Sequence, residues 1–185
     1  MASVLVPLAE GFEELEAVSI IDILRRGEVE VVSAGLQEGP VRGARGTVIL
    51  PDSTLDAVME RDFDLIALPG GQPGTRNLHA DPRVKMLLAR FRDQGRFTAA
   101  ICAAPSIFAD YGLLAGKRAT SFPGSIDPQR GDFQYSEESV VVDGNVITSR
   151  GPGTAMDFAL TLVELLQGPA GRTAVEQGLV RPARS

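Results

Sequence analysis

The stretch Thr98-Ala-Ala-Ile-Cys-Ala-Ala-Pro-Ser106 decides the fold. Residues 97–101 form a short apolar run, which is typical of a strand covered on both faces of a parallel sheet. Small residues follow Cys102, and a helix is expected directly after them. A strand that runs directly through a nucleophile-type residue into a helix is typical of a nucleophile elbow, a strained turn that exposes the nucleophilic side chain. The sequence therefore predicts an α/β protein with Cys102 at a sharp strand-to-helix turn.

The rest of the chain alternates strand and helix signals. Apolar runs predict further strands at residues 3–8, 29–34 and 64–68 and hairpins at 41–50 and 140–148. Helical periodicity predicts helices at residues 13–26, 82–94, 103–111 and 154–166. We expect a single domain over residues 1–185, with Gly168-Pro169 ending the last helix and a weakly specified tail after about residue 171. This alternation predicts a mainly parallel sheet with helices on both faces.

The first predicted helix carries two signals. One broad apolar face, which we expect to pack on the core, is marked by Leu15, Val18, Ile21 and either Ile23 or Leu24. Glu13, Glu14 and Glu16 lie in its first turns, where acids suit the helix dipole. Ordinary helix-end charge accounts for any one of these acids, but Glu16 can also point back toward the end of the sheet.

Composition excludes several classes of protein. The formal net charge of −6 argues against nucleic acid and anionic membrane surfaces as partners. We see no signal peptide and no apolar run of about 20 residues, so we expect a cytoplasmic protein without a membrane partner. One cysteine and one histidine cannot make a disulfide scaffold or an ordinary zinc site. No metal or cofactor is expected, and His79 is expected to be exposed to solvent.

Cys102 has two interpretations. A thiol at a helix N-terminus is biased toward the thiolate, so its pKa is expected to be lowered. A free cysteine is also often a small buried hydrophobe. A neighbouring Glu16 would repel a thiolate unless it kept its proton and donated a hydrogen bond to the sulfur, so the pair would titrate as a unit. Gly70-Gly71, after a predicted strand, is either a turn that needs glycine or part of an oxyanion hole.

Four segments together resemble the DJ-1/PfpI (ThiJ/PfpI) family, closest to its DJ-1-like branch, which includes bacterial members. They are Ala9-Glu-Gly-Phe-Glu-Glu-Leu-Glu-Ala17, Leu68-Pro-Gly-Gly71, Ala99-Ala-Ile-Cys-Ala-Ala-Pro105 and Thr148-Ser-Arg-Gly-Pro-Gly-Thr154. Each is weak alone, but their order and spacing are specific and span nearly the whole chain. The resemblance implies a flavodoxin-like three-layer sandwich and usually a homodimer, with Asp22 in the helix that makes the dimer contact.

The resemblance also implies roles for individual residues. Cys102 matches the reactive cysteine and Glu16 the protonated acid that contacts it. Gly71 and Ala103 match the family's backbone donors near the sulfur. Arg45, Arg150 and Pro152 match the residues that form an anion-binding pocket beside the cysteine in the family.

One position departs from the family pattern. Many members carry a histidine in this pocket, at the position that Phe122 occupies in the segment Thr120-Ser-Phe-Pro123. A Cys-His-acid triad is therefore not available there, which weakens protease or amidotransferase chemistry. Proton transfers are left to Glu16 or water.

Three functions follow from these observations. The leading hypothesis is a cofactor-free, glutathione-independent glyoxalase, of the glyoxalase III or protein deglycase type, in which Cys102 attacks methylglyoxal or glyoxal. The alternative is an oxidative-stress sensor or chaperone that uses reversible oxidation of Cys102. A cysteine hydrolase or peptidase is the third, disfavoured by Phe122.

Overall fold

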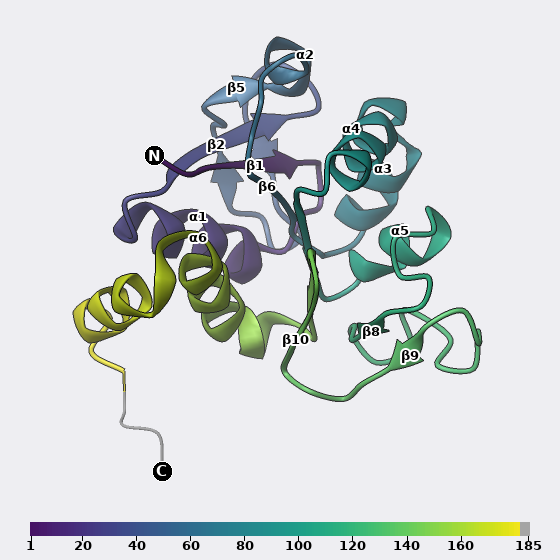
Figure 1. Ribbon diagram of the computed structural model, residues 1–185. Helices are drawn as coiled ribbons and strands as arrows, with labels where there is room; N and C mark the ends of the chain where they lie inside the picture. Colours follow the sequence, from purple (N-terminus) through teal and green to yellow (C-terminus); the bar gives the residue numbers. More distant parts are fainter. Residues whose placement is uncertain (182–185) are drawn as a thin grey trace.

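A seven-stranded sheet forms the middle layer of the computed structural model, which describes residues 1–181 (Figure 1). The strand order is β10-β11-β7-β6-β1-β2-β5, and all neighbouring strands are parallel except β10 and β11. The strands are β1 Ser3–Leu8, β2 Glu30–Gly35, β5 Ser53–Thr54, β6 Leu65–Leu68, β7 Phe97–Ile101, β10 Val140–Asp143 and β11 Val146–Ser149. This arrangement confirms the mainly parallel sheet.

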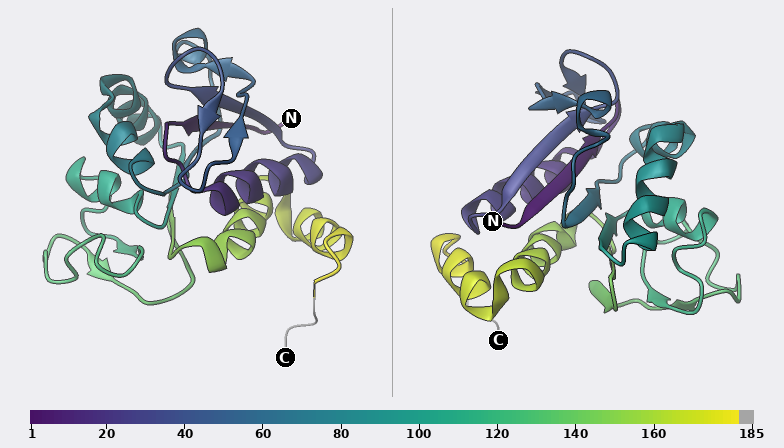
Figure 2. Two further views of the ribbon diagram at one scale, coloured as in Figure 1. Left: turned by 180° about the vertical axis from the view of Figure 1, so that it is seen from behind. Right: turned by 45° about the horizontal axis from the view of Figure 1, so that its top comes forward.

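Helices cover both faces of the sheet (Figure 2, right). They are α1 Glu14–Arg26, α2 Leu55–Val58, α3 Gly74–Ala80, α4 Pro82–Asp93, α5 Pro105–Asp110 and α6 Ala155–Gly178, with a 3-10 turn at Pro152–Thr154. Alternation along β1 divides the core, because Val4 and Val6 pack with α1 and α6 whereas Leu5 packs with α4 and α5. Among residues 1–181, no helix has both the length and the apolar character needed to cross a bilayer.

Two small strand pairs lie outside the main sheet. β3 (Val41–Arg42) and β4 (Val48–Ile49) form the antiparallel hairpin expected between residues 41 and 50. β8 (Arg118–Ala119) pairs in parallel with β9 (Gln134–Tyr135), and no sequence pattern predicted this two-residue pairing. The pair supports the segment that leads to Phe122.

The buried face of α1 differs from the predicted one. Leu15 is 63% exposed and Val18 46% exposed, whereas Glu14 and Glu16 are buried. The helix is apolar on more than one side, so periodicity could not select the face that packs on the sheet. The structure buries the stripe made by Ala17, Ile20, Ile23 and Leu24. The expectation for Leu15 and Val18 was therefore wrong, and this rotation turns Glu16 toward the strand ends.

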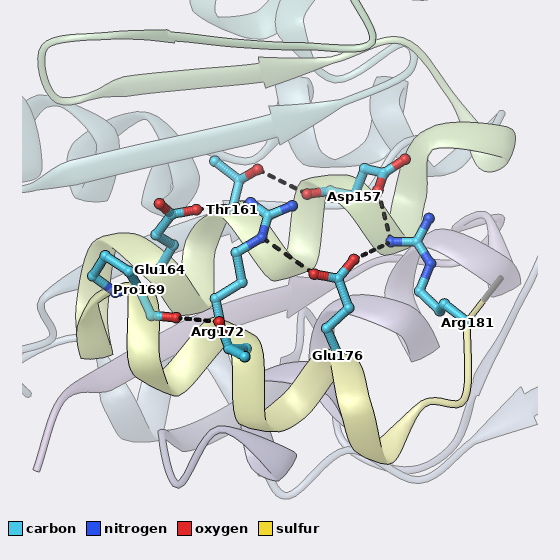
Figure 3. A network of polar contacts seen from close by, with 8 residues as sticks. Asp157, Thr161, Glu164, Pro169, Arg172, Glu176 and Arg181 are labelled. Atoms are coloured by element: carbon cyan, nitrogen blue, oxygen red, sulfur yellow. Dashed lines mark hydrogen bonds and ion pairs between the residues drawn. The ribbon is translucent and has the colours of Figure 1, made fainter. Parts of the chain in front are cut away.

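The chain breaks its helical path at Gly168 and then continues. Gly168 has φ 79°, which confirms an interruption at Gly168-Pro169. A second helical segment follows as far as Gly178, so the expectation of a weakly specified tail was wrong there. Two ion pairs join the part of the chain after Gly168 to the preceding turns of α6, Arg172 with Glu164 and Arg181 with Asp157, as Figure 3 shows. Within the later part, Glu176 pairs with both arginines. Residues 182–185 lie outside the described part of the chain.

Candidate active site

Cys102 lies in the turn between β7 and α5, as the sequence predicted. Its φ of 65° is in the left-handed region, which costs an L-residue about 1–2 kcal/mol. Two backbone hydrogen bonds hold it there: its N–H donates to the Ser149 carbonyl at 2.9 Å, and its carbonyl accepts from the Phe122 N–H at 2.8 Å. The residue is 8% exposed. Strain of this kind persists where the surrounding structure enforces it, and it is common at active sites.

Glu16 reaches the same place from the first turn of α1. Its side chain is fully buried, and its Oε2 accepts the Gly70 N–H at 2.8 Å. Within residues 1–181 its Oε1 is buried and has no hydrogen bond of normal geometry, and the Cys102 thiol lies beside the carboxyl. Burial raises the pKa of Glu16 to about 7. The carboxyl therefore holds its proton to near neutral pH, as the Glu–Cys pairing requires.

The pKa of Cys102 moves opposite to our expectation. Burial and the neighbouring Glu16 carboxylate raise this pKa to about 12, while the backbone N–H groups of Gly71 and Ala103 oppose the rise. Loss of water around the sulfur thus outweighs the helix N-terminus, because α5 is short and begins only at Pro105. The thiol becomes a strong nucleophile only when its proton moves to a base, and the Glu16 carboxyl group lies beside it.

Gly70 and Gly71 allow the backbone to approach this pair. A Cβ on Gly70 would lie 2.7 Å from Cys102 Cβ and 2.9 Å from Glu16 Oε2. Gly71 has φ 89°, and a Cβ there would lie 2.4 Å from the Glu13 backbone nitrogen. Gly70 therefore has to be glycine for close contact with the reactive pair, whereas Gly71 has to be glycine because of its positive φ and its packing on the backbone of residues 11–13.

The expected pocket residues fall into two groups. Arg150 and Pro152 directly follow β11, whose Ser149 carbonyl binds the Cys102 N–H. Arg150 donates from Nη1 to the Glu137 carbonyl at 3.1 Å, so its guanidinium is tethered. Arg45 comes from the separate β3–β4 hairpin and is exposed to solvent.

Phe122 lies beside the elbow. Besides its bond to the Cys102 carbonyl, its ring is 3.3 Å from the place where a Cβ on Gly151 would be. The side chain is 47% exposed. An apolar ring therefore occupies the position where the resemblance would put a titratable base.

His79 does not join the site. It lies in α3, its ring centroid is 5.1 Å from that of Tyr111, and its Nε2 is 3.5 Å from Asp110 Oδ2. The side chain is 42% exposed, which confirms the expected solvent exposure. Neither His79 nor the residue at position 122 therefore supplies an imidazole base beside the thiol, and the expectation that Glu16 or water transfers the proton stays open.

Sequence reasoning missed two polar features near the site. Ser149 Oγ lies 2.7 Å from Thr154 Oγ1, and this pair ties the end of β11 to the start of α6. Glu14 is nine-tenths buried although it looked like ordinary helix-end charge. The only available signal was its position two residues before Glu16, which gives no information on what buries it.

Comparison with known proteins places this geometry in a family. The model of the DJ-1/PfpI family matches residues 2–165. The chain belongs to the DJ-1/PfpI family. Parkinson disease protein 7 homolog of Danio rerio is 43% identical over 180 residues, which cover 95% of each protein.

Two further members of the DJ-1/PfpI family show how far the similarity extends. Glutathione-independent glyoxalase DJR-1.2 of Caenorhabditis elegans is 38% identical over 168 residues, 91% of this chain and 89% of that protein. The crystal structure of Drosophila melanogaster DJ-1beta matches with a TM-score of 0.94 and 41% identity over 98% of both chains. The predicted flavodoxin-like sandwich is thereby confirmed.

Proposed function

We propose that the protein is a cysteine-dependent, cofactor-free glyoxalase that converts methylglyoxal or glyoxal to the hydroxy acid. The observation that carries this proposal is the fully buried Glu16, with its pKa raised to about 7, beside the only cysteine of the chain. The family includes a glutathione-independent glyoxalase in Caenorhabditis elegans, which supports the same chemistry here.

Each step of this reaction has a group to perform it. The Glu16 carboxylate takes the thiol proton while sulfur adds to the aldehyde carbon, giving a hemithioacetal. The N–H groups of Gly71 and Ala103 face the sulfur and stabilise the oxyanion that develops on the former carbonyl oxygen. Glu16 passes the thiol proton to this oxyanion, which completes the hemithioacetal and restores the Glu16 carboxylate. The carboxylate then takes the proton of the former aldehyde carbon and delivers it to the adjacent carbonyl carbon, while the hemithioacetal hydroxyl proton passes to the oxygen of that carbonyl, which gives the thioester of the hydroxy acid. Water hydrolyses the thioester, so the overall change is the addition of one water to methylglyoxal to form lactate.

Purified protein tests the reaction directly. We expect lactate to form from methylglyoxal with the parent protein, and Cys102→Ser to reduce its rate to background. Glu16→Gln should lower kcat by about 100-fold or more, the usual contribution of a positioned acid–base group. Unchanged turnover in Cys102→Ser would overturn the proposal.

Protein deglycation is the finer part of the proposal. Removal of free methylglyoxal also lowers the amount of adduct on a protein, since the early adducts form reversibly. A pre-formed, isolated adduct incubated with the enzyme and an excess of an aldehyde scavenger separates the two. Acceleration beyond the scavenger alone identifies true deglycation.

Reversible oxidation of Cys102 is the second candidate function. The N–H groups that face the sulfur could hold sulfinate oxygens, and a protonated Glu16 could donate to one of them. Mild peroxide should then add two oxygens to Cys102 alone, as read by mass spectrometry. Oxidation spread over the four methionines would count against a sensor or chaperone role. A hydrolase or peptidase has less support, since Phe122 stands where a base would be needed.

A homodimer in the cytoplasm is the proposed working form. The exposed Leu15 and Val18 lie on the same helix as Asp22, which is the helix expected to make the contact. Val18→Asp should convert the dimer to a monomer in light scattering. Met86→Asp, at an exposed apolar position on α4, is the control and should not change the mass.

A further inference from the structure

Glu14 is a second buried acid in the first turn of α1, and the proposed chemistry does not use it. Its Oε1 accepts the Arg45 N–H at 2.6 Å and the Thr47 N–H at 3.3 Å. Its Oε2 is buried and has no hydrogen-bond partner within residues 1–181. Hydrogen bonds from backbone N–H groups to a carboxylate are among the stronger kinds, so this acid is an anchor for the segment that binds it.

The β3–β4 hairpin is built around this carboxyl group. A Cβ on Gly43 would lie 2.5 Å from both the carboxyl carbon and Oε1 of Glu14, so the hairpin backbone rests directly on the acid. The Gly43 N–H donates to the Thr47 carbonyl at 2.8 Å, which closes the turn that carries Arg45. In the view from behind, the two short blue strands of the hairpin lie beside the purple first turns of α1 (Figure 2, left).

Backbone contacts connect the hairpin with Cys102. The Ala44 N–H donates to the Phe12 carbonyl at 2.8 Å, and the Glu13 N–H donates to the Gly70 carbonyl at 2.9 Å. Gly70 in turn touches Cys102 and Glu16. The turn that carries Arg45 therefore lies at the rim of the site, two backbone hydrogen bonds away from the reactive pair.

Arg45 is available to a ligand at this rim. Its side chain is exposed, and no hydrogen bond or ion pair occupies its guanidinium in residues 1–181. The contrast is Arg150, whose guanidinium is tethered to the Glu137 carbonyl. Glu13 forms no ion pair with Arg45 within residues 1–181, and its carboxylate caps α1 by accepting the Glu16 N–H at 2.9 Å.

We propose that Glu14 is a positioning residue that fixes Arg45 at the rim, so that Cys102 reacts preferentially with small electrophiles that carry an anionic group. The proposal concerns the same site as the proposed function and depends on Cys102 being its reacting group. Glu14 acts through the hairpin backbone and does not touch the substrate. Its effect must therefore disappear when Arg45 is absent.

Two alkylating reagents of nearly equal size test this selectivity without any turnover. Iodoacetate is anionic and iodoacetamide is neutral, and mass spectrometry gives the rate at which each modifies Cys102. We expect Arg45→Ala to lower the iodoacetate-to-iodoacetamide rate ratio about five-fold, the effect of one charge at a partly solvated distance. Glu14→Ala should lower it to a similar extent. Glu14→Gln should retain most of the ratio, since its amide oxygen can accept the same two N–H groups.

The direction of the change in the rate ratio distinguishes a positioning role of Glu14 from a direct electrostatic effect of its charge. Removal of a carboxylate near Cys102 should favour the anionic reagent, so a fall in the ratio for Glu14→Ala is opposite to the direct electrostatic effect. Glu38→Gln, which removes one exposed negative charge elsewhere, is the matched control and should leave the ratio unchanged. Glu14→Ala combined with Arg45→Ala should lower the ratio no further than Arg45→Ala alone.

Two outcomes would overturn the inference: additive effects in the double variant, or an unchanged ratio in Glu14→Ala. If Glu14→Ala does not fold, Gly43→Ala replaces it, because this variant keeps both charged residues and disturbs only their fit. An unchanged ratio in Gly43→Ala has the same meaning. Failure of the proposed function would appear separately, as absence of lactate from a parent protein whose reagent ratio still depends on Glu14.

Discussion

Acidic side chains are buried at the start of α1, whereas the charged side chains in the C-terminal half of α6 form partly exposed ion pairs. Glu16 is fully buried, and within the described chain its Oε1 has no hydrogen bond of normal geometry. Arg172, at the other end of the helical layer, binds both Glu164 and Glu176 in a partly exposed network (Figure 3). An uncompensated buried acid costs stability, whereas paired surface charges cost little and contribute little. A buried acid with unmet hydrogen-bonding capacity therefore lies where the chemistry is proposed, and the experiments below test this contrast.

Replacement of Gly70 should give the largest effect. Gly70→Ala puts a methyl group within 3 Å of Cys102 Cβ, Glu16 Oε2 and the Ile101 carbonyl, so backbone or side chains must move apart. We expect loss of lactate formation by at least about 100-fold and a fall in the free energy of unfolding of about 1–3 kcal/mol. Gly178→Ala is the control, because no atom lies within 4 Å of its added Cβ. Equal stability and activity in both variants would contradict the close packing of the reactive pair.

The pH dependence of stability should give the next largest effect. Because the pKa of Glu16 is raised from 4.5 to about 7, the native state binds more protons than the unfolded chain between these values. The native state is therefore favoured most below pH 4.5 and loses stability as the pH rises to about 7. The loss from this one group amounts to about 3 kcal/mol. Urea unfolding of the parent and of Glu16→Gln across this range measures it as their difference.

Glu16→Gln should remove this pH dependence of the free energy of unfolding, whereas Glu164→Gln, in the α6 network, should keep it. A parent protein whose difference from Glu16→Gln stays constant with pH would show that Glu16 is ionised in the native state. The acid would then lack the pKa near 7 that lets it exchange protons with the thiol and the substrate at neutral pH.

Relief of the backbone strain at position 102 should have a smaller effect on the free energy of unfolding. Glycine adopts φ 65° without a steric penalty, whereas alanine does not. Cys102→Gly should therefore be more stable than Cys102→Ala by about 1 kcal/mol, despite the usual entropic cost of glycine. Thermal or urea unfolding of the two variants gives the difference directly. If Cys102→Ala were the more stable of the two, the elbow would not be strained.

Much of the fold could be predicted because the signals were local. The apolar run at residues 97–101, the hairpin at residues 140–148 and the helix at residues 82–94 each depend on local sequence, and the structure has them where expected. The buried face of α1 could not be predicted, because the choice between two apolar stripes depends on the sheet end that it must reach. The same holds for the two-residue strands β8 and β9, which exist only through tertiary pairing.

In the candidate site, too, local features could be predicted from the sequence and features that depend on distant segments could not. The position of Cys102 in a strand-to-helix turn follows from its neighbours in sequence. The direction of its pKa shift does not, because burial depends on segments far away in the chain: Glu16, Gly71 and Ser149 all approach the thiol or its backbone from other elements. Glu14 is the clearest case, since the hairpin that buries it begins more than 25 residues later.

The α6 network should give the smallest effect. Arg172→Ala removes two ion pairs whose acidic partners are 42% and 31% exposed, so we expect a loss of only about 0.5–1 kcal/mol in the free energy of unfolding. The loss should shrink in 0.5–1 M salt, since such pairs are screened over a few ångströms. Cys102 alkylation should not change, because the network lies on the far side of α6 from the elbow. A loss above about 3 kcal/mol that salt does not reduce would place a buried charge in the C-terminal segment and remove the contrast with α1.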